Sequence, residues 1–145
     1  MKLTHTETIH ASRETVFGLL SDPAKQLLWR DGLVSIDAVD GSPAAAGVGT
    51  RTVEVFHKGR KKTVYRISSE VLASEAPTLL ATRISHPDFA GDITYRLDTV
   101  DGKTRLVSEA DMTYAGNAVA RFLGQMAVHH NRADMKRLIK LAEAA

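Results

Sequence analysis

The fold is decided by residues 117–144, NAVARFLGQMAVHHNRADMKRLIKLAEA. This segment has no proline and one glycine, Gly124, and no other part of the sequence has a helical pattern of that length. Apart from two short helical segments near the N-terminus, everything before it has the pattern of strands and turns. A lone helix beside so much strand must bury its apolar stripe on a sheet, so the sequence predicts an α+β fold.

The apolar stripe of this helix changes direction halfway along, at about 100° per residue. In the first half, one face carries Val119, Phe122, Leu123, Met126 and Ala127. In the second half, a face about a third of a turn away carries Met135, Leu138, Ile139, Leu141 and Ala142. Either the first half covers a cavity or a loop while the second packs on the sheet, or the helix curves along a twisted sheet.

The composition is that of one globular domain, which we expect to span residues 1–145. Of these residues 43% are hydrophobic and none is cysteine, so disulfides and thiolate chemistry are excluded. The formal charge of +2 gives no argument for nucleic-acid binding. The opening MKLTHTETIH lacks the apolar run of a signal peptide, and no stretch approaches the ~20 apolar residues of a membrane span. We therefore expect a cytoplasmic protein with no stable membrane insertion and no nucleic-acid partner.

Short alternating segments predict seven strands, at residues 3–9, 33–39, 50–57, 63–71, 77–85, 92–98 and 105–114. Two short helices are expected between the first two strands, the first capped by Ser12 and the second begun by Asp22-Pro23. Because most of the strands follow one another through turns, the sheet should be antiparallel. A curved sheet of seven strands has more concave face than one helix can fill, so we expect an apolar cavity between them.

The alternation along each strand predicts which residues face inward. Val53 and Val55 are expected to share the inner face of their strand, together with Arg51 and His57. The next strand should place Tyr65, Ile67 and Val71 inside, and a later one Ile93, Tyr95 and Leu97. For residues 77–85 two faces compete, Leu79, Ala81 and Arg83 against Leu80, Thr82 and Ile84.

Three motifs and the closing helix together resemble the START-like superfamily, also called SRPBCC, in the branch labelled polyketide cyclase/dehydrase. The motifs are TETIHASRETVFGLLSD (6–22), the tryptophan segment QLLWRDGLVSIDAVDG (26–41) and the glycine loop GVGTRTV (47–53). The resemblance implies a helix-grip fold, in which the sheet wraps around the long helix and leaves an elongated apolar cavity. It also implies binding of lipids, sterols, hormones or polyketides, and in some members catalysis on them. No catalytic set is shared across the superfamily, so none is carried over.

The expected cavity gives a set of candidate ligand-binding residues: Trp29, Val55, Tyr65, Tyr95, Phe122, Met126 and His130. His130 lies on the first-half face of the helix, where it would bind a ligand hydroxyl or act as a general base, unless it sits at the rim. The tyrosines would orient a ligand through their phenols, or serve as core residues with the hydroxyl at an edge. Trp29 would pack the short helices onto the sheet, contact a ligand, or both. Arg51 in the pocket would favour a carboxylate ligand.

The leading hypothesis is therefore a protein that binds a small hydrophobic molecule, as a monomer or homodimer and without a cofactor. The alternative is an enzyme of the cyclase or dehydratase type, in which His130 or a tyrosine moves a proton on a polyketide-like substrate. A third hypothesis is an interaction module that uses the basic hairpin HKGRKK, residues 57–62, which is otherwise a solvated turn. The sequence has no pattern with metal-ligand spacing, no P-loop and no GxSxG.

Overall fold

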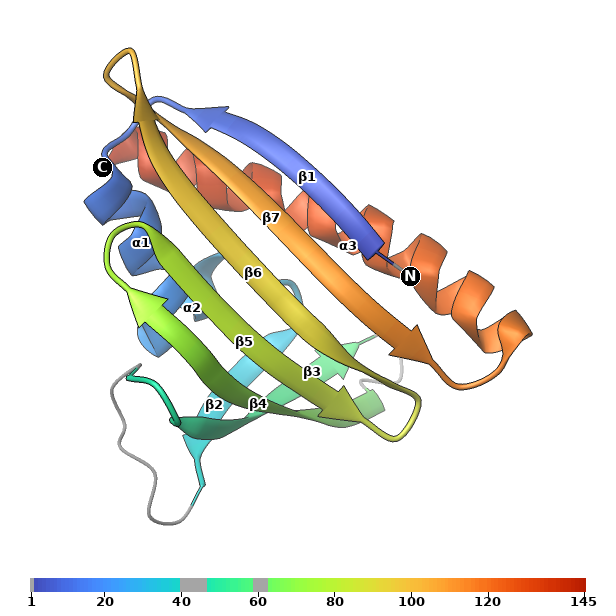
Figure 1. Ribbon diagram of the computed structural model, residues 1–145. Coiled ribbons are helices and arrows are strands. Elements are labelled where there is room, and N and C mark those ends of the chain that lie inside the picture. Colours follow the sequence, from blue (N-terminus) through green and yellow to red (C-terminus); the bar gives the residue numbers. More distant parts are fainter. Residues whose placement is uncertain (1, 40–46, 59–62) are drawn as a thin grey trace.

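The computed structural model describes residues 2–39, 47–58 and 63–145, without the side chains of 58, 63 and 119–130. The predicted Lys58-Gly59-Arg60 hairpin turn and most of the loop at 40–49 lie outside the described residues. Seven strands and three helices follow in the order β1 (Lys2–Ile9), α1 (Arg13–Ser21), α2 (Pro23–Trp29), β2 (Leu33–Ala38), β3 (Arg51–Lys58), β4 (Thr63–Glu75), β5 (Leu79–His86), β6 (Phe89–Val100), β7 (Lys103–Tyr114) and α3 (Asn117–Ala144) (Figure 1).

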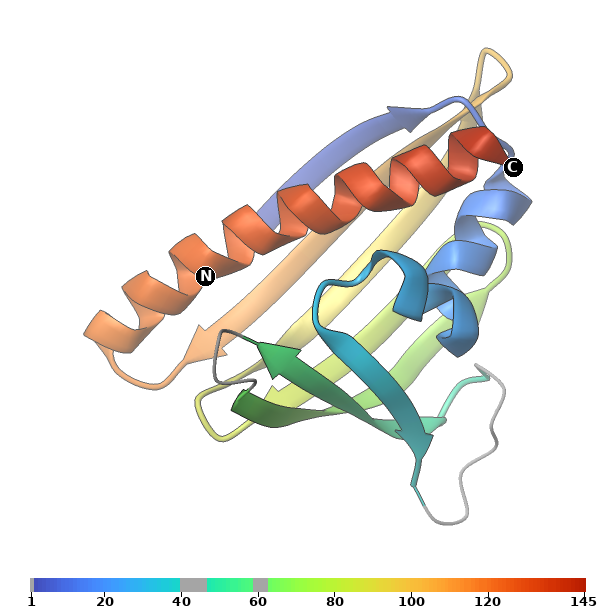
Figure 2. The same cartoon turned by 180° about the vertical axis from the view of Figure 1, so that it is seen from behind.

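All seven strands form one antiparallel sheet in the order β1-β7-β6-β5-β4-β3-β2. Neighbours in the chain are neighbours in the sheet, except that β1 pairs with β7. The register shifts between Leu33 and Ser35 in β2 and between Val71 and Ala73 in β4. Such bulges bend and twist a strand, which lets the β2–β4 end of the sheet curl over its concave face (Figures 1 and 2). The predicted α+β fold, with two short helices after β1 and a long C-terminal helix, is confirmed.

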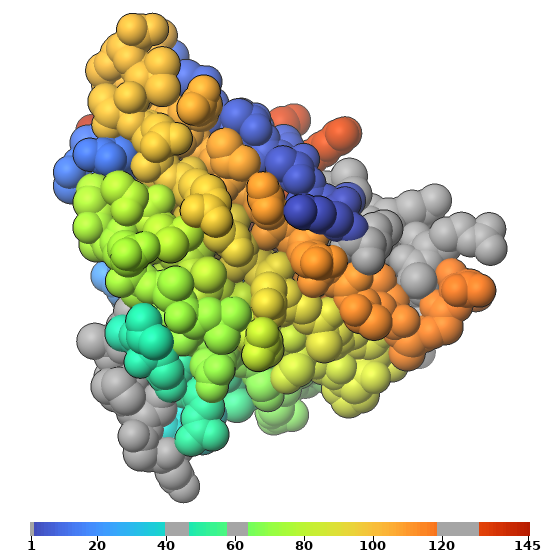
Figure 3. All heavy atoms as spheres, in the orientation of Figure 1, coloured from blue at the N-terminus to red at the C-terminus, as the bar shows by residue number. Residues whose placement is uncertain are grey.

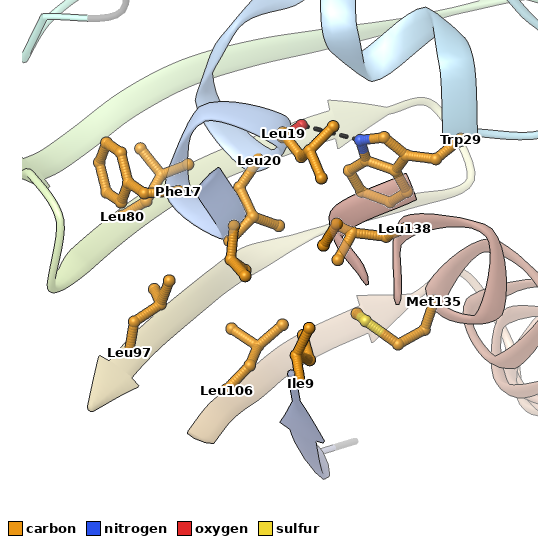
Figure 4. Close-up of a cluster of buried hydrophobic side chains, with 12 residues drawn as sticks. Ile9, Phe17, Leu19, Leu20, Trp29, Leu80, Leu97, Leu106, Met135 and Leu138 are labelled. Carbon is orange, nitrogen blue, oxygen red and sulfur yellow. Dashed lines mark hydrogen bonds between the residues drawn. The ribbon is translucent and has the colours of Figure 1, made fainter. Parts of the chain in front are cut away.

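The two short helices begin where the sequence predicts. The Ser12 side chain accepts a hydrogen bond from the Thr15 amide, and the Asp22 side chain accepts one from the Ala24 amide, with proline at the start of α2. These caps satisfy amides that have no partner within the helix. The indole of Trp29 donates to the Leu19 carbonyl at 2.8 Å, which ties the end of α2 to α1 (Figure 4).

The long helix α3 lies along one edge of the sheet, over β1 and β7, and it also contacts α1 and α2 (Figure 2). Its second half packs as predicted, because Met135, Leu138 and Ala142 are buried in the main core cluster. Figure 4 shows Met135 and Leu138 facing Ile9 and Leu106 of the β1/β7 edge. The side chains of the first half lie outside the described residues, so its two alternative roles stay predictions.

One inner face was predicted wrongly. Thr52, Glu54 and Phe56 of β3 face the concave side, and Val55 does not. The pattern of apolar residues gave the opposite face because the buried position between Val53 and Val55 holds a charged residue, Glu54, which is 6% exposed. Successive residues of a strand point to opposite faces. One buried, paired charge is therefore enough to make the apolar pattern indicate the wrong inner face. For β5 the structure selects Leu80, Thr82 and Ile84 as the inner face.

The buried apolar side chains form two separate clusters. The larger joins α1, Trp29, the second half of α3 and the inner faces of β5–β7 near Leu80, Leu97 and Leu106 (Figure 4). The smaller is Leu33, Phe56 and Ile67, under the curled β2–β4 end. Figure 3 shows the outer face of the sheet, where the side chains of β5, β6, β7 and β1 lie next to one another. The two clusters and the space between them lie on the opposite, concave side.

Candidate functional site

A cavity of about 700 Å³ lies between the concave face of the sheet, α2 and α3. Its lining includes Leu20, Trp29 and Leu80 of the larger cluster and Phe56 and Ile67 of the smaller one. The cavity divides the core because α3 contacts β1 and β7, while β5 and β6 are contacted by the shorter helix α1. Its volume falls within the roughly 300–1,000 Å³ of small-molecule sites. Half-exposed lining residues such as Val64, 44% exposed, mark its opening to solvent.

Aromatic side chains form much of the wall towards the curled end of the sheet. Phe56 and Tyr65 are stacked, with ring centroids 5.9 Å apart and planes at 19°. Phe89 stacks on His86 at 4.8 Å and lies tilted against Tyr114 at 6.4 Å. All five residues line the cavity. Flat, rigid rings offer large contact area with little loss of rotamer freedom, which suits a planar or extended apolar molecule.

A buried ion pair interrupts this apolar lining. Arg30, directly after α2, donates from Nη1 to Glu54 Oε2 at 2.6 Å and from Nη2 to Glu54 Oε1 at 2.9 Å. Arg30 Nη1 also donates to Gln26 Oε1 at 2.8 Å, and the guanidinium lies 5.4 Å from the centre of the Phe56 ring. Burial alone would lower the pKa of Arg30, but the charge and the hydrogen bonds of Glu54 outweigh it, so the pKa is raised. The pair fixes the end of α2 to β3.

Asp134 of α3 completes this polar end of the cavity. Its Oδ1 accepts from the Asp31 amide at 3.1 Å and from Arg137 Nη1 at 2.6 Å. Arg137 Nη1 also donates to the Trp29 carbonyl at 3.3 Å. The first residues after α2 are thus held by β3 on one side and α3 on the other, which fixes the position of the Trp29 ring at the cavity wall.

Tyr95 of β6 lines the cavity near these charges. Burial raises the pKa of its phenol, the Arg30 charge opposes that rise, and the charges of Glu54 and Asp134 add to it. Within the part of the chain that the structure describes, its hydroxyl makes no hydrogen bond. A protonated phenol without a partner, at the wall of an apolar cavity, can donate to an oxygen of a bound molecule. The pKa of Tyr65 is also raised, by burial and by the charge of Asp31.

The structure brings together only part of the predicted site. Trp29, Tyr65 and Tyr95 line the cavity, whereas Val55 does not, because Glu54 and Phe56 occupy the inner face of β3. That these three residues bind a ligand stays a prediction. The side chains of Phe122, Met126 and His130 lie outside the described residues. Arg51 and His57 are exposed and do not line the cavity, so the reason for expecting a carboxylate at Arg51 falls away.

Sequence reasoning missed the Arg30–Glu54 pair. The two residues are separated by 24 positions, and although Arg30 lies in the tryptophan segment 26–41, nothing in that segment points to Glu54. The one available signal was a glutamate at the centre of an apolar strand segment, VEV at 53–55, where a charge is costly unless it is paired.

Among the described residues, no group of three or more histidine or acidic side chains is placed to hold a metal ion. No described helix combines the length and the apolar character that crossing a membrane would require.

Several solved structures have the same fold. Protein CV1439 from Chromobacterium violaceum is 14% identical, with a TM-score of 0.81 over 98% of this chain and 96% of that one. An uncharacterised protein from Rhizobium leguminosarum is 10% identical, with a TM-score of 0.80 over 100% and 95%. Ara h 8.0201 is 14% identical, with a TM-score of 0.71 over 97% and 98%. At these identities the likeness concerns the fold alone.

No curated protein matches the chain. The sequence profile of one family, described as polyketide cyclase / dehydrase and lipid transport, matches residues 1–144. This confirms the resemblance drawn from the opening, tryptophan and glycine-loop motifs. The chain belongs to the polyketide cyclase / dehydrase and lipid transport family.

Proposed function

We propose that the protein binds a small hydrophobic molecule in the cavity between the sheet and α3. The observation that carries this proposal is the volume of about 700 Å³ that separates the two core clusters and is lined mostly by apolar side chains. A bound apolar molecule would replace the contacts of these apolar side chains with water by close packing.

The expected affinity follows from the apolar surface area of the ligand that the cavity can bury. Burying roughly 300 Å² of apolar ligand surface contributes about 7 kcal/mol before the costs of association are subtracted. About 7 kcal/mol corresponds to a dissociation constant of roughly 10 µM before those costs, so simple apolar probes should bind more weakly than that. Trp29, Tyr65 and the other aromatic side chains would supply contact area, and the Tyr95 hydroxyl would fix orientation by donating to a ligand oxygen.

The test uses the single tryptophan of the chain, which lies in the wall. Titration with N-phenylnaphthylamine, an uncharged apolar fluorophore, should quench Trp29 emission in a saturable way. Thr82→Phe places a ring on the inner face of β5 and should weaken binding at least tenfold. Thr94→Phe, on the neighbouring strand but not in the cavity lining, is the matched control and should leave binding within about twofold. Unsaturable quenching, or equal effects of the two variants, would contradict the proposal.

A second candidate is an enzyme of the cyclase or dehydratase type acting on a polyketide-like substrate in the same cavity. Tyr95 favours it, because a phenol at the cavity wall that stays protonated at neutral pH and has no described hydrogen-bond partner can donate a hydrogen bond to a carbonyl oxygen or a leaving hydroxyl, although its raised pKa makes it a weaker acid. His130 stays a candidate base from its position in the sequence. Incubation with a poly-β-keto thioester, followed by mass spectrometry, should show loss of water that is abolished in Tyr95→Phe. Binding without any turnover would leave only the first proposal.

A further inference from the structure

An arginine in a cavity wall ordinarily favours a carboxylate ligand, but the hydrogen-bond donors of Arg30 are already engaged within the protein. The two terminal nitrogens of Arg30 donate to both carboxylate oxygens of Glu54, and Nη1 also donates to Gln26 Oε1. The guanidinium group lies over the Phe56 ring. A bidentate pair of this kind neutralises the guanidinium within the protein. An incoming carboxylate would have to displace Glu54, whose side chain is only 8% exposed.

The other charged residues of the described lining are acidic. Arg30 is the one arginine or lysine among the described residues of the cavity wall, and the acidic residues of that wall are Asp31, Glu54, Asp88, Glu109 and Asp134. Two of these, Glu54 and Asp134, are mostly buried, with side chains 8% and 18% exposed. Asp31 and Asp88 are more exposed, with side chains 49% and 63% exposed. Glu109 lies between the inward-facing Ser108 and Ala110, so its side chain lies on the outer face of the sheet.

The basic residues that pair with these carboxylates do not make the charge of the cavity lining positive. Arg137 contacts Asp134 and Asp31, and Lys2 lies 3.9 Å from Glu109, but neither Arg137 nor Lys2 lines the cavity. Two histidines do line it, and both rings are already hydrogen-bonded: His5 pairs with Glu7, and Nδ1 of His86 accepts from the Asp88 amide. Burial is the main cause of the raised pKa values of Tyr65 and Tyr95; the charge of Asp31 adds to the rise at Tyr65, whereas at Tyr95 the charge of Arg30 opposes the rise and the charges of Glu54 and Asp134 add to it.

We propose that the cavity selects a molecule whose polar group is uncharged, such as an alcohol, ketone or ester, and discriminates against carboxylates such as free fatty acids. A carboxylate in the cavity finds no uncommitted arginine or lysine among the described lining residues, and the acidic residues Asp134, Asp31 and Asp88 of the same wall repel it. A neutral oxygen can accept from the Tyr95 hydroxyl without that repulsion. This inference rests on the proposed binding function and specifies the class of ligand.

The first test compares ligands that share one chain and differ in the polar group. Dodecanol, methyl dodecanoate and dodecanoate are titrated, below their aggregation concentrations and at neutral pH, against the protein loaded with N-phenylnaphthylamine. The alcohol and the ester should displace the fluorophore at least tenfold more readily than the carboxylate. Displacement by dodecanoate that is as strong as by the alcohol would overturn the charge selectivity but leave the binding function standing. If the fluorophore does not bind at all, the binding function itself is refuted.

The second test changes the charge that excludes carboxylates. Glu54→Gln keeps the shape of the side chain and leaves the Arg30 guanidinium without a counter-charge at the wall. Dodecanoate should then bind at least tenfold more tightly, and dodecanol should change by less than about threefold. Asp92→Asn, which removes an exposed carboxylate away from the cavity, should change neither ligand. Unaltered dodecanoate binding in a folded Glu54→Gln protein would contradict the inference. If Glu54→Gln does not fold, the comparison of dodecanol, methyl dodecanoate and dodecanoate on the wild-type protein decides whether the cavity discriminates against carboxylates.

Discussion

Breaking the Arg30–Glu54 pair should destabilise the fold far more than breaking a surface pair of the same geometry. In Glu54→Leu the guanidinium loses two hydrogen bonds, of 2.6 and 2.9 Å, while its side chain remains only 20% exposed. Charged hydrogen bonds contribute about 1.5–3 kcal/mol each, and removing one partner of a buried pair costs about 3–5 kcal/mol. Arg30 keeps Gln26 as an acceptor and borders the cavity, so we expect the lower end, about 3 kcal/mol.

Urea unfolding followed by circular dichroism measures this loss. With a denaturant slope of about 2 kcal/mol per M, the midpoint should fall by about 1.5 M. The double variant Arg30→Met with Glu54→Leu removes both charges and should recover most of the stability, giving a coupling energy of at least about 1.5 kcal/mol.

The matched control is the exposed pair of Arg83 and Asp92, also held by two hydrogen bonds, at 2.9 and 3.2 Å, with side chains 59% and 43% exposed. Solvent screens such a pair, so Asp92→Asn should leave the midpoint within experimental scatter. Equal midpoint shifts in Glu54→Leu and Asp92→Asn would refute the argument from burial.

Three further perturbations test the packing and the ionisation of the core. Gly91→Ala should lower the unfolding free energy by about 2–3 kcal/mol, since a Cβ there would overlap the Asp111 carbonyl oxygen of β7 and the Met112 side chain, whereas Gly47→Ala, with no atom within 4 Å, should be neutral by thermal melting. Leu138→Ala, fully buried, should cost about 2–5 kcal/mol in urea unfolding, whereas Leu28→Ala, 62% exposed, should cost little; similar losses would show that the core is misplaced. Burial raises the pKa of all three tyrosines, Tyr95 among them, so the folded protein holds phenolic protons that the unfolded chain releases near pH 10, and stability must fall as pH rises above that value. Phenolate absorbance that develops in the folded protein below about pH 10 would contradict this.

The fold could be predicted because its signals are local. Ser12 and Asp22-Pro23 mark helix starts by their own chemistry, and Tyr65 and Tyr95 lie in strands whose alternation is regular. Short turns between most strands left an antiparallel sheet as the simplest arrangement, and the one long helix had a single sheet to pack on.

The site was only partly predictable because its polar half depends on distant partners. Glu54 faces inward through its pairing with Arg30, and no local pattern distinguishes that glutamate from one that points to solvent. The sequence favoured Val55 instead, since hydrophobicity is the only guide to a strand's inner face when pairing is unknown. Gly91 is a similar case: its need for glycine arises from the close approach of β7, a feature of strand packing rather than of its neighbours in sequence.

Native mass spectrometry of the protein incubated with N-phenylnaphthylamine is the most direct test of the unfilled volume between the two core clusters. The wild-type protein should carry one molecule of the fluorophore, and Thr82→Phe should lose it under the same conditions while Thr94→Phe retains it. A wild-type spectrum with only the mass of the bare chain, or several molecules attached without saturation, would mean that the space is not a binding cavity.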